Sequence, residues 1–200
     1  PAEQYAIQTG QHPAVTTDKI GSEGFPDLLG EFSTTYNAGA TARTTNLKLA
    51  SNKINNTVVM PGETFSYNKV VGKRTVAAGY KEAPAYAGGK VVNDIGGGIC
   101  QITSTLYNAV IFANLDIVSR SNHQFVPSYV KAGRDATVVY GAIDFKFKNT
   151  RKYPIKIKSS VSGGIAKIQI FGMKEETEYD VKIETKITGS IPMQTTYEDD

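Results

Sequence analysis

Apolar residues recur every three or four positions in two parts of the chain. Between Leu47 and Val58 they alternate with polar residues, which predicts an amphipathic helix of about three turns with Thr44 or Thr45 as its N-cap. The apolar spacing over residues 102–113 predicts a second helix, buried on one face. The second helix lies near the middle of the chain, so we expect it to be a central element of the fold.

Apolar and polar residues alternate on both sides of this second helix, which predicts strands. The expected strands cover residues 63–71, 115–120, 123–130, 136–149, 153–161 and 165–172. Gly163 and Gly164 separate the last two, as in a hairpin. A mixed first half, a central helix and a run of antiparallel strands predict an α+β fold, with the central helix packed on an antiparallel sheet.

The chain divides into three segments by composition. Residues 1–30 contain prolines and glycines without sustained periodicity and are expected to form an N-terminal arm. Residues 31–172 carry the regular patterns and are expected to form the main domain. Residues 173–200 are charged and are expected to be a linker followed by the truncated start of a β module. Within the main domain, residues 72–98 are rich in glycine, which is typical of a long functional loop.

Composition narrows the classes of partner. The 200 residues have a net charge of +3 without a dense Lys/Arg run, so we expect no nucleic-acid partner. No apolar run reaches the roughly 18 residues that a membrane span needs. The single cysteine excludes an internal disulfide, and without paired cysteines or closely spaced histidines we expect no metal and no cofactor.

The stretch "GGGICQ" places that cysteine between a glycine-rich turn and the predicted central helix. Gly97 and Gly98 allow a tight turn and close approach of a ligand. The first helical turn offers free N–H groups and a positive dipole end, which favour a thiolate at Cys100. The N–H groups of residues 99–101 and the side chain of Gln101 would then bind an oxyanion. The alternative is a buried and inert cysteine of the core.

A nucleophilic cysteine needs a base, and the chain has two histidines. His12 lies in the expected arm, whereas His123 follows the central helix at the start of a predicted strand, where it is either the base or a structural imidazole. Asp135, Asp144 and Asn149 are candidates to orient it, and Asp144 is preferred because it lies within a predicted strand; a turn or solvated role is the alternative for each. The order Cys, His, Asp is similar to that of transglutaminase-like and papain-like thiol enzymes.

Several long motifs resemble the VanW family over about residues 31–172. They are "TTNLKLASNKINNTVVMPGETFSYNKVVGKRT", "GYKEAPAYAGGKVVNDIGGGICQITSTLYNAV", "SNHQFVPSYVKAGRDATVVYG" and "DFKFKNTRKYPIKI". The family pattern includes the positions of Gly97, Gly98, Cys100, Gln101, Ser104, Thr105, Asn108, His123, Arg134, Asp135 and Asp144. The resemblance implies an extracytoplasmic protein of the Gram-positive cell envelope, associated with vancomycin resistance. Members are often followed by a G-five-type module, and the tail "IPMQTTYEDD" is similar to the start of one. The resemblance implies no established activity.

Two hypotheses follow. In the first, the chain is a thiol enzyme for acyl transfer or amide hydrolysis on peptidoglycan peptides, with Cys100 as nucleophile, His123 as base and Asp144 or Asp135 as the orienting group. Substrate contacts would come from Gly97, Gly98, Gln101, Ser104, Asn108, Tyr86 and Arg134. In the second, the chain is a module that binds wall glycan or peptide without catalysis. Tyr80, Tyr86 and Tyr107 would then supply flat contact surfaces, and Cys100 would be structural.

Overall fold

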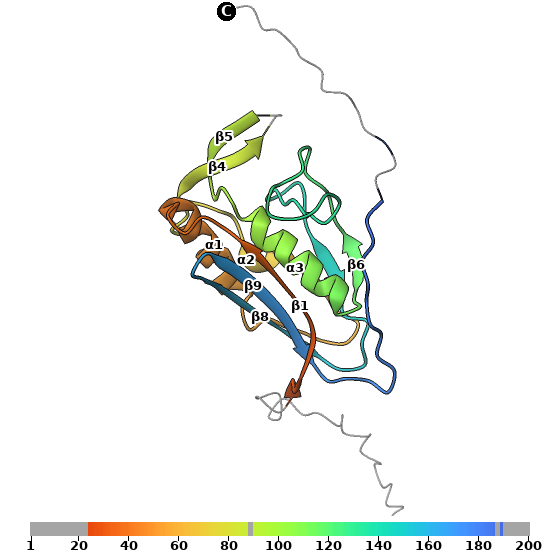
Figure 1. Cartoon of the computed structure of the whole chain (residues 1–200). Helices are drawn as coiled ribbons and strands as arrows, with labels where there is room; N and C mark the ends of the chain where they lie inside the picture. Colours follow the sequence, from red (N-terminus) through yellow and green to blue (C-terminus); the bar gives the residue numbers. More distant parts are fainter. Residues whose placement is uncertain (1–23, 88–89, 187–188, 190–200) are drawn as a thin grey trace, which may run out of the picture.

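The computed structural model describes residues 24–87, 90–186 and 189, and it has the expected α+β fold (Figure 1). The larger sheet is antiparallel, with strand order β1-β9-β8-β2. Its strands are β1 (Asp27–Thr35), β9 (Ile165–Gly172), β8 (Ile155–Ser162) and β2 (Val58–Val59). Two helices, α1 (Thr41–Ile54) and α3 (Cys100–Phe112), pack against this sheet.

Alternation along β8 and β9 gives the larger sheet one buried face. Ile155, Ile157, Ile168 and Ile170 are fully buried beneath the helices, whereas the intervening residues, such as Lys158, remain accessible to water. Burying an isoleucine side chain contributes about 1.5–3 kcal/mol, so these four residues are a major source of the stability of this layer. The hairpin expected at Gly163 and Gly164 joins β8 to β9.

The central helix α3 is buried on nearly all sides, where the sequence predicted burial on one face. It contacts β1 and β9 of the larger sheet and also β6 (Asp116–Ser119) of a second sheet. That sheet has the order β3-β7-β6, with β3 at Thr64–Ser66 and β7 at Lys146–Lys148. A helix enclosed in this way is a rigid platform for its first residue, which is Cys100.

Some predicted strands have a different structure. Residues 63–71 form β3 and then the short helix α2 (Tyr67–Val71), because the Ser66 side chain caps that helix by accepting from Lys69 N at 3.1 Å. The glycine-rich stretch contains a hairpin, β4 (Glu82–Ala87) with β5 (Lys90–Ile95), that projects from the body of the fold (Figure 1). All but the last residue of β5 are exposed, so its sequence lacks the alternation that would reveal a strand.

The segment between β6 and β7 is mostly irregular, although strands were predicted over 123–130 and 136–149. It forms two isolated bridges, Ser121–Thr137 and Val139–Ile143, before β7 begins. The backbone of Arg134 and Ala136 in this segment bonds to side chains of α3, as described below.

The ends of two elements also differ from the sequence prediction. The helix α1 begins at Thr41 after Ala40, and Thr45 lies inside it, where its hydroxyl donates to Thr41 O. The strand β1 begins at Asp27, within the residues expected to form an arm, and pairs with β9. Residues 1–23, with His12, and the tail "IPMQTTYEDD" lie outside the described residues. None of the described helices is long and apolar enough to cross a membrane.

Candidate active site

Cys100 is the first residue of α3, and Ile99 alone separates it from the three glycines. Gly98 has φ +101°, a left-handed conformation that glycine adopts without the cost of a side chain. A Cβ at Gly97 would lie 2.1 Å from the carbonyl oxygen of Ala83, so this position also needs glycine for close packing against β4. The partly buried sulfur of Cys100 lies 3.6 Å from Thr137 Oγ1.

His123 and Asp135 form a buried pair beside this thiol. One carboxylate oxygen of Asp135, Oδ2, lies 2.6 Å from both the backbone nitrogen and Nδ1 of His123. The other oxygen accepts from Arg120 Nη2 at 3.0 Å. His123 also interacts with the thiol of Cys100, and each group shifts the pKa of the other toward its charged form. Since Nδ1 of His123 bonds to Asp135, Nε2 is the ring nitrogen available to interact with the sulfur.

These contacts shift the pKa values of the site toward a charged pair. Burial raises the pKa of the Cys100 thiol, but the hydrogen bonds of His123, Val138 and Thr137 outweigh it, and the net shift is downward. Burial lowers the pKa of His123, but Asp135 and Cys100 raise it more strongly, to about 9. The thiolate form of Cys100 and the imidazolium form of His123 therefore favour each other.

Asp135 is held in place by side chains of α3. Ser104 Oγ accepts from Ala136 N at 2.9 Å, and Asn108 Nδ2 donates to Arg134 O at 2.8 Å. Arg134 Nε in turn donates to Asn108 Oδ1 at 2.7 Å. Ser104 and Asn108 are completely buried. These residues, expected to contact substrate, instead bind the Arg134–Ala136 segment and fix it to the helix.

Asp144, the preferred orienting residue of the sequence analysis, lies elsewhere. Its two carboxylate oxygens accept from Ser66 Oγ at 2.6 Å and from Asn68 N at 2.9 Å, at the start of α2. Asn149, the third candidate, donates to Val59 O and Tyr153 O. The structure thus pairs His123 with Asp135 and brings neither of the other two to the imidazole.

The expected oxyanion donors are only partly available. Gln101 Nε2 donates to Thr34 Oγ1 and Thr35 O, which uses both of its hydrogens. The backbone N–H groups of Ile99 and Gln101 donate to Gly96 O and Gly98 O. Among the described residues, the N–H of Cys100 has no acceptor, so it is the remaining donor of the three backbone groups.

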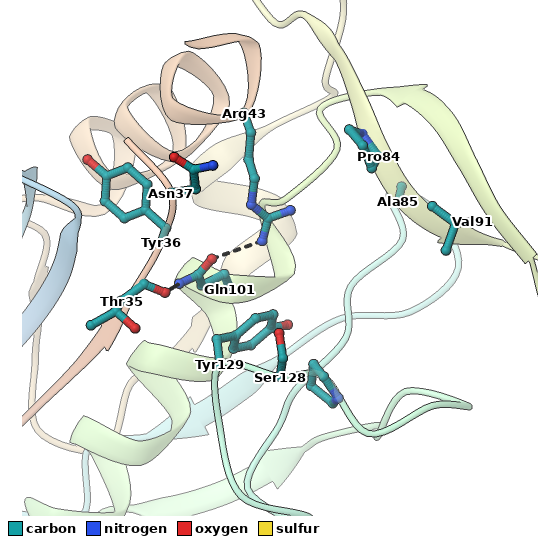
Figure 2. A pocket seen from close by; sticks show the side chains of 11 residues that line it. Thr35, Tyr36, Asn37, Arg43, Pro84, Ala85, Val91, Gln101, Ser128 and Tyr129 are labelled. Carbon is teal, nitrogen blue, oxygen red and sulfur yellow. Dashed lines mark hydrogen bonds between the residues drawn. The ribbon is translucent and has the colours of Figure 1, made fainter. Parts of the chain in front are cut away.

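A cavity of about 390 Å³ opens next to Gln101 (Figure 2). Its walls come from the end of β1, the start of α1, the β4–β5 hairpin and the loop after β6. The lining residues are Thr35, Tyr36, Asn37, Arg43, Pro84, Ala85, Val91, Gln101, Pro127, Ser128 and Tyr129. Arg43 donates to Gln101 Oε1 at 2.9 Å.

The sequence analysis missed Arg43 and Tyr129. Arg43 follows the helical pattern of α1 like any polar residue, and Tyr129 lies in a stretch that was predicted to be a strand. Burial, together with the charge of Cys100, raises the pKa of Tyr129.

The aromatic residues of the binding hypothesis have mixed positions. Tyr80 is 1% exposed, and the ring of Tyr107 packs edge-on against Phe145, so neither presents an open contact surface. The side chain of Tyr86 lies outside the described ones. Within the part of the chain that the structure describes, no group of three His, Cys, Asp or Glu side chains is arranged to hold a metal ion.

The family model described as "VanW like protein" matches residues 42–171, which include Arg43, Cys100, His123 and Asp135. The chain belongs to the VanW-like family. This VanW-like chain is 46% identical to the uncharacterized protein YoaR of Bacillus subtilis over 143 residues, or 72% of the chain and 47% of YoaR.

It is also 36% identical to the vancomycin B-type resistance protein VanW of Enterococcus faecalis over 110 residues, or 52% of the chain and 40% of that protein. The chain thus spans less than half the length of these two relatives. No solved structure matches it.

Proposed function

We propose that this VanW-like domain is a cysteine-dependent enzyme that transfers or hydrolyses acyl groups of peptidoglycan peptides. The observation that carries the proposal is the set of Cys100, His123 and Asp135 at the N-terminus of α3: His123 Nδ1 lies 2.6 Å from Asp135 Oδ2, and the imidazole and the thiol shift each other's pKa toward the charged forms. A nucleophile, a base and a group that orients the base are the minimum parts of such a site.

The proposed chemistry uses these three residues in two steps. The thiolate of Cys100 attacks the carbonyl carbon of an amide, and the resulting oxyanion accepts from the Cys100 N–H. The imidazolium of His123 gives its proton to the leaving amine, so that a thioester and a free amine form. His123 is then neutral and takes a proton from water or from an acceptor amine. The attack of that water or amine on the thioester releases the acyl group and restores the starting Cys100–His123 pair.

The substrate class and location rest on two supports. One relative, VanW of Enterococcus faecalis, is named as a vancomycin resistance protein, which supports a role at the cell wall and an extracytoplasmic location. The cavity beside Gln101 has the size of a small-ligand or peptide site. The tail from residue 173 is proposed to lead into a module of the G-five type.

The proposal is tested by the rate of Cys100 alkylation with iodoacetamide between pH 5 and pH 10. We expect rapid reaction in the native protein with a midpoint below that of a free thiol, because His123 stabilises the thiolate. In His123→Ala the midpoint should rise to that of a free thiol or above. Asp144→Asn is the matched control and should keep the unmodified profile, since the Asp144 carboxylate accepts from Ser66 and Asn68 at the start of α2 and not from His123.

A second measurement separates catalysis from binding. Purified peptidoglycan fragments incubated with the protein should lose or exchange a peptide end, detected by mass spectrometry, and Cys100→Ala should abolish this. If alkylation requires denaturant and does not depend on His123, the thiol is structural. The chain would then be a module that binds wall glycan or peptide.

A further inference from the structure

The cavity beside Gln101 contains one charged lining residue, Arg43 (Figure 2). Its Nη2 donates to the neutral Gln101, and no carboxylate of the described residues pairs with it. The guanidinium lies against the backbone at Gly98, where a Cβ would come within 2.9 Å of Nη1. Because Gly98 has no side chain, the guanidinium of Arg43 has room to lie beside it at the cavity.

The position of Arg43 in the fold is unfavourable for a cation. It is the third residue of α1, and the first turn of that helix contains no acidic residue. The N-terminal end of a helix carries a partial positive charge that disfavours a further cation. The first turn of α3, with Gln101, lies at the same cavity, so the electrostatic potential there is positive and suits an anion.

The remaining walls fit a peptide better than a free inorganic anion. Pro84 and Val91 of the hairpin lie across the cavity from Tyr129 of the loop (Figure 2), and Pro127 also lines the cavity, which adds apolar surface beside the guanidinium. Arginine binds a carboxylate through two parallel N–H groups, and one Nη2 contact to Gln101 leaves other donors of the fork available. A ligand with an apolar body and a carboxylate end therefore matches both parts of the cavity.

The cavity adjoins the thiol through two lining residues. Gln101 directly follows Cys100 in the chain, and Tyr129 lies close enough to Cys100 for the charge of that residue to help raise the pKa of Tyr129. A peptide end bound there would carry its neighbouring amide toward the sulfur.

We propose that Arg43 binds the C-terminal carboxylate of the peptide substrate, so that Cys100 attacks an amide close to the carboxyl end. This inference rests on the proposed function, and it specifies the substrate class as peptides with a free carboxyl end. The leaving amine is then the C-terminal residue or a short C-terminal fragment, which departs with the proton from His123.

Binding is measured by calorimetry with Cys100→Ala, which removes the reaction but leaves the cavity. The probes are N-acetyl-trialanine peptides of the L and D series, each with a free carboxylate or a C-terminal amide. We expect the carboxylate form of at least one series to bind about 10–100-fold more tightly than its amide, the range expected for hydrogen bonds to a charged group. Adding Arg43→Gln should remove this preference, and Arg43→Lys should keep part of it.

Lys48→Gln is the matched control, since it removes a positive charge from α1 at an exposed site outside the cavity. It should keep the full preference, and circular dichroism should show that every variant is folded. Equal binding of carboxylate and amide, a preference that survives Arg43→Gln, or no binding at about 10 mM would overturn the assignment of Arg43. Failure of the proposed function would appear separately, in the alkylation profile of Cys100.

Discussion

A single carboxylate oxygen of Asp135 binds two atoms of His123, the backbone nitrogen and Nδ1. This contact fixes both the position of the residue and the orientation of its ring. The imidazole is thus held with its second nitrogen toward Cys100. Its charge depends on the carboxylate, because an anion in a site of low dielectric stabilises the protonated ring.

Asp135→Asn should therefore lower the pKa of His123 from about 9 toward 6.5, since the asparagine carries no charge. A titration followed by NMR of the imidazole Cε1 proton measures this change directly. Asp144→Asn should leave that pKa unchanged, because its carboxylate lies at the start of α2. A His123 pKa that stays near 9 in Asp135→Asn would show that Asp135 is not the stabilising charge.

Among individual site residues, the sequence identified those whose side-chain chemistry is rare in the chain. Cys100 is the single cysteine, and the glycines before it indicated a turn into a helix. Asp135 was one of three candidates, and the choice between them depended on a strand over 136–149 that the structure has only in part. Arg43 could not be predicted, because its position on α1 has meaning only once the β4–β5 hairpin and the loop are placed beside it.

The polar residues of α3 link the helix to the segment that carries Asp135. Asn108 makes two such contacts, donating to Arg134 O and accepting from Arg134 Nε, and it also donates to Ser104 O within the helix. The site therefore depends on bonds made two turns away from Cys100. Such bonds escape sequence patterns, because a buried asparagine in a helix looks like an exposed one.

Asn108→Ala should destabilise the protein by roughly 1–3 kcal/mol, since it leaves buried polar groups of Arg134 without partners. It should also slow the alkylation of Cys100 at pH 7, because Asp135 and His123 lose their fixed position. Urea unfolding and the alkylation rate measure the two effects. Asn149→Ala is the matched control. It removes an equally buried asparagine that follows β7 and bonds to β2, so it should destabilise the fold while preserving the alkylation rate.

The glycine turn holds β4 against the start of α3, because Gly97 packs against the backbone of β4. Gly97→Ala would place a Cβ 2.1 Å from Ala83 O and force the hairpin away from α3. We expect a loss of roughly 1–3 kcal/mol, as for other overpacked sites, measured by thermal unfolding. Gly39→Ala, whose Cβ would meet only the side chain of Asn37, at 3.1 Å, should have a smaller effect, and equal losses would argue against the close packing.

For the whole molecule, the coupled Cys100–His123 pair controls how stability varies with pH. The stabilisation from His123 is complete below its unfolded pKa of 6.5 and is lost as the pH rises through about 9. The stabilisation from Cys100 runs the other way and is lost as the pH falls from 9.0 through its lowered pKa. From the lowered pKa of Cys100 up to pH 9 the two changes oppose each other, so each offsets part of the slope of the other.

Cys100→Ser removes one of these two contributions and should expose the other. Relative to the double variant Cys100→Ser/His123→Ala, its free energy of unfolding should then decrease from pH 6.5 to pH 9, because Asp135 still holds His123 protonated in the folded state. Urea unfolding at pH 6, 7.5 and 9 measures the difference. A slope no different from that of the double variant would show that the pKa of His123 is not raised when the thiol is absent.

The overall architecture was the part most accessible to sequence analysis. The alternating isoleucines of β8 and β9 and the helical spacing in α1 and α3 arise from burial, and burial patterns are visible in a sequence. The β4–β5 hairpin was missed because its second strand has almost no buried face. The irregular segment after β6 was missed because side chains of α3, rather than a partner strand, satisfy its backbone.

A cysteine with a lowered pKa is also a target for peroxide, which converts its thiolate to a sulfenic acid. Many proteins protect such a group by forming a disulfide with a second cysteine nearby. This chain contains one cysteine in 200 residues, so it has no internal partner for that reaction. Reversal of oxidation at Cys100 therefore depends on a thiol from outside these 200 residues, and without one continued exposure to peroxide converts the sulfur to irreversible acids.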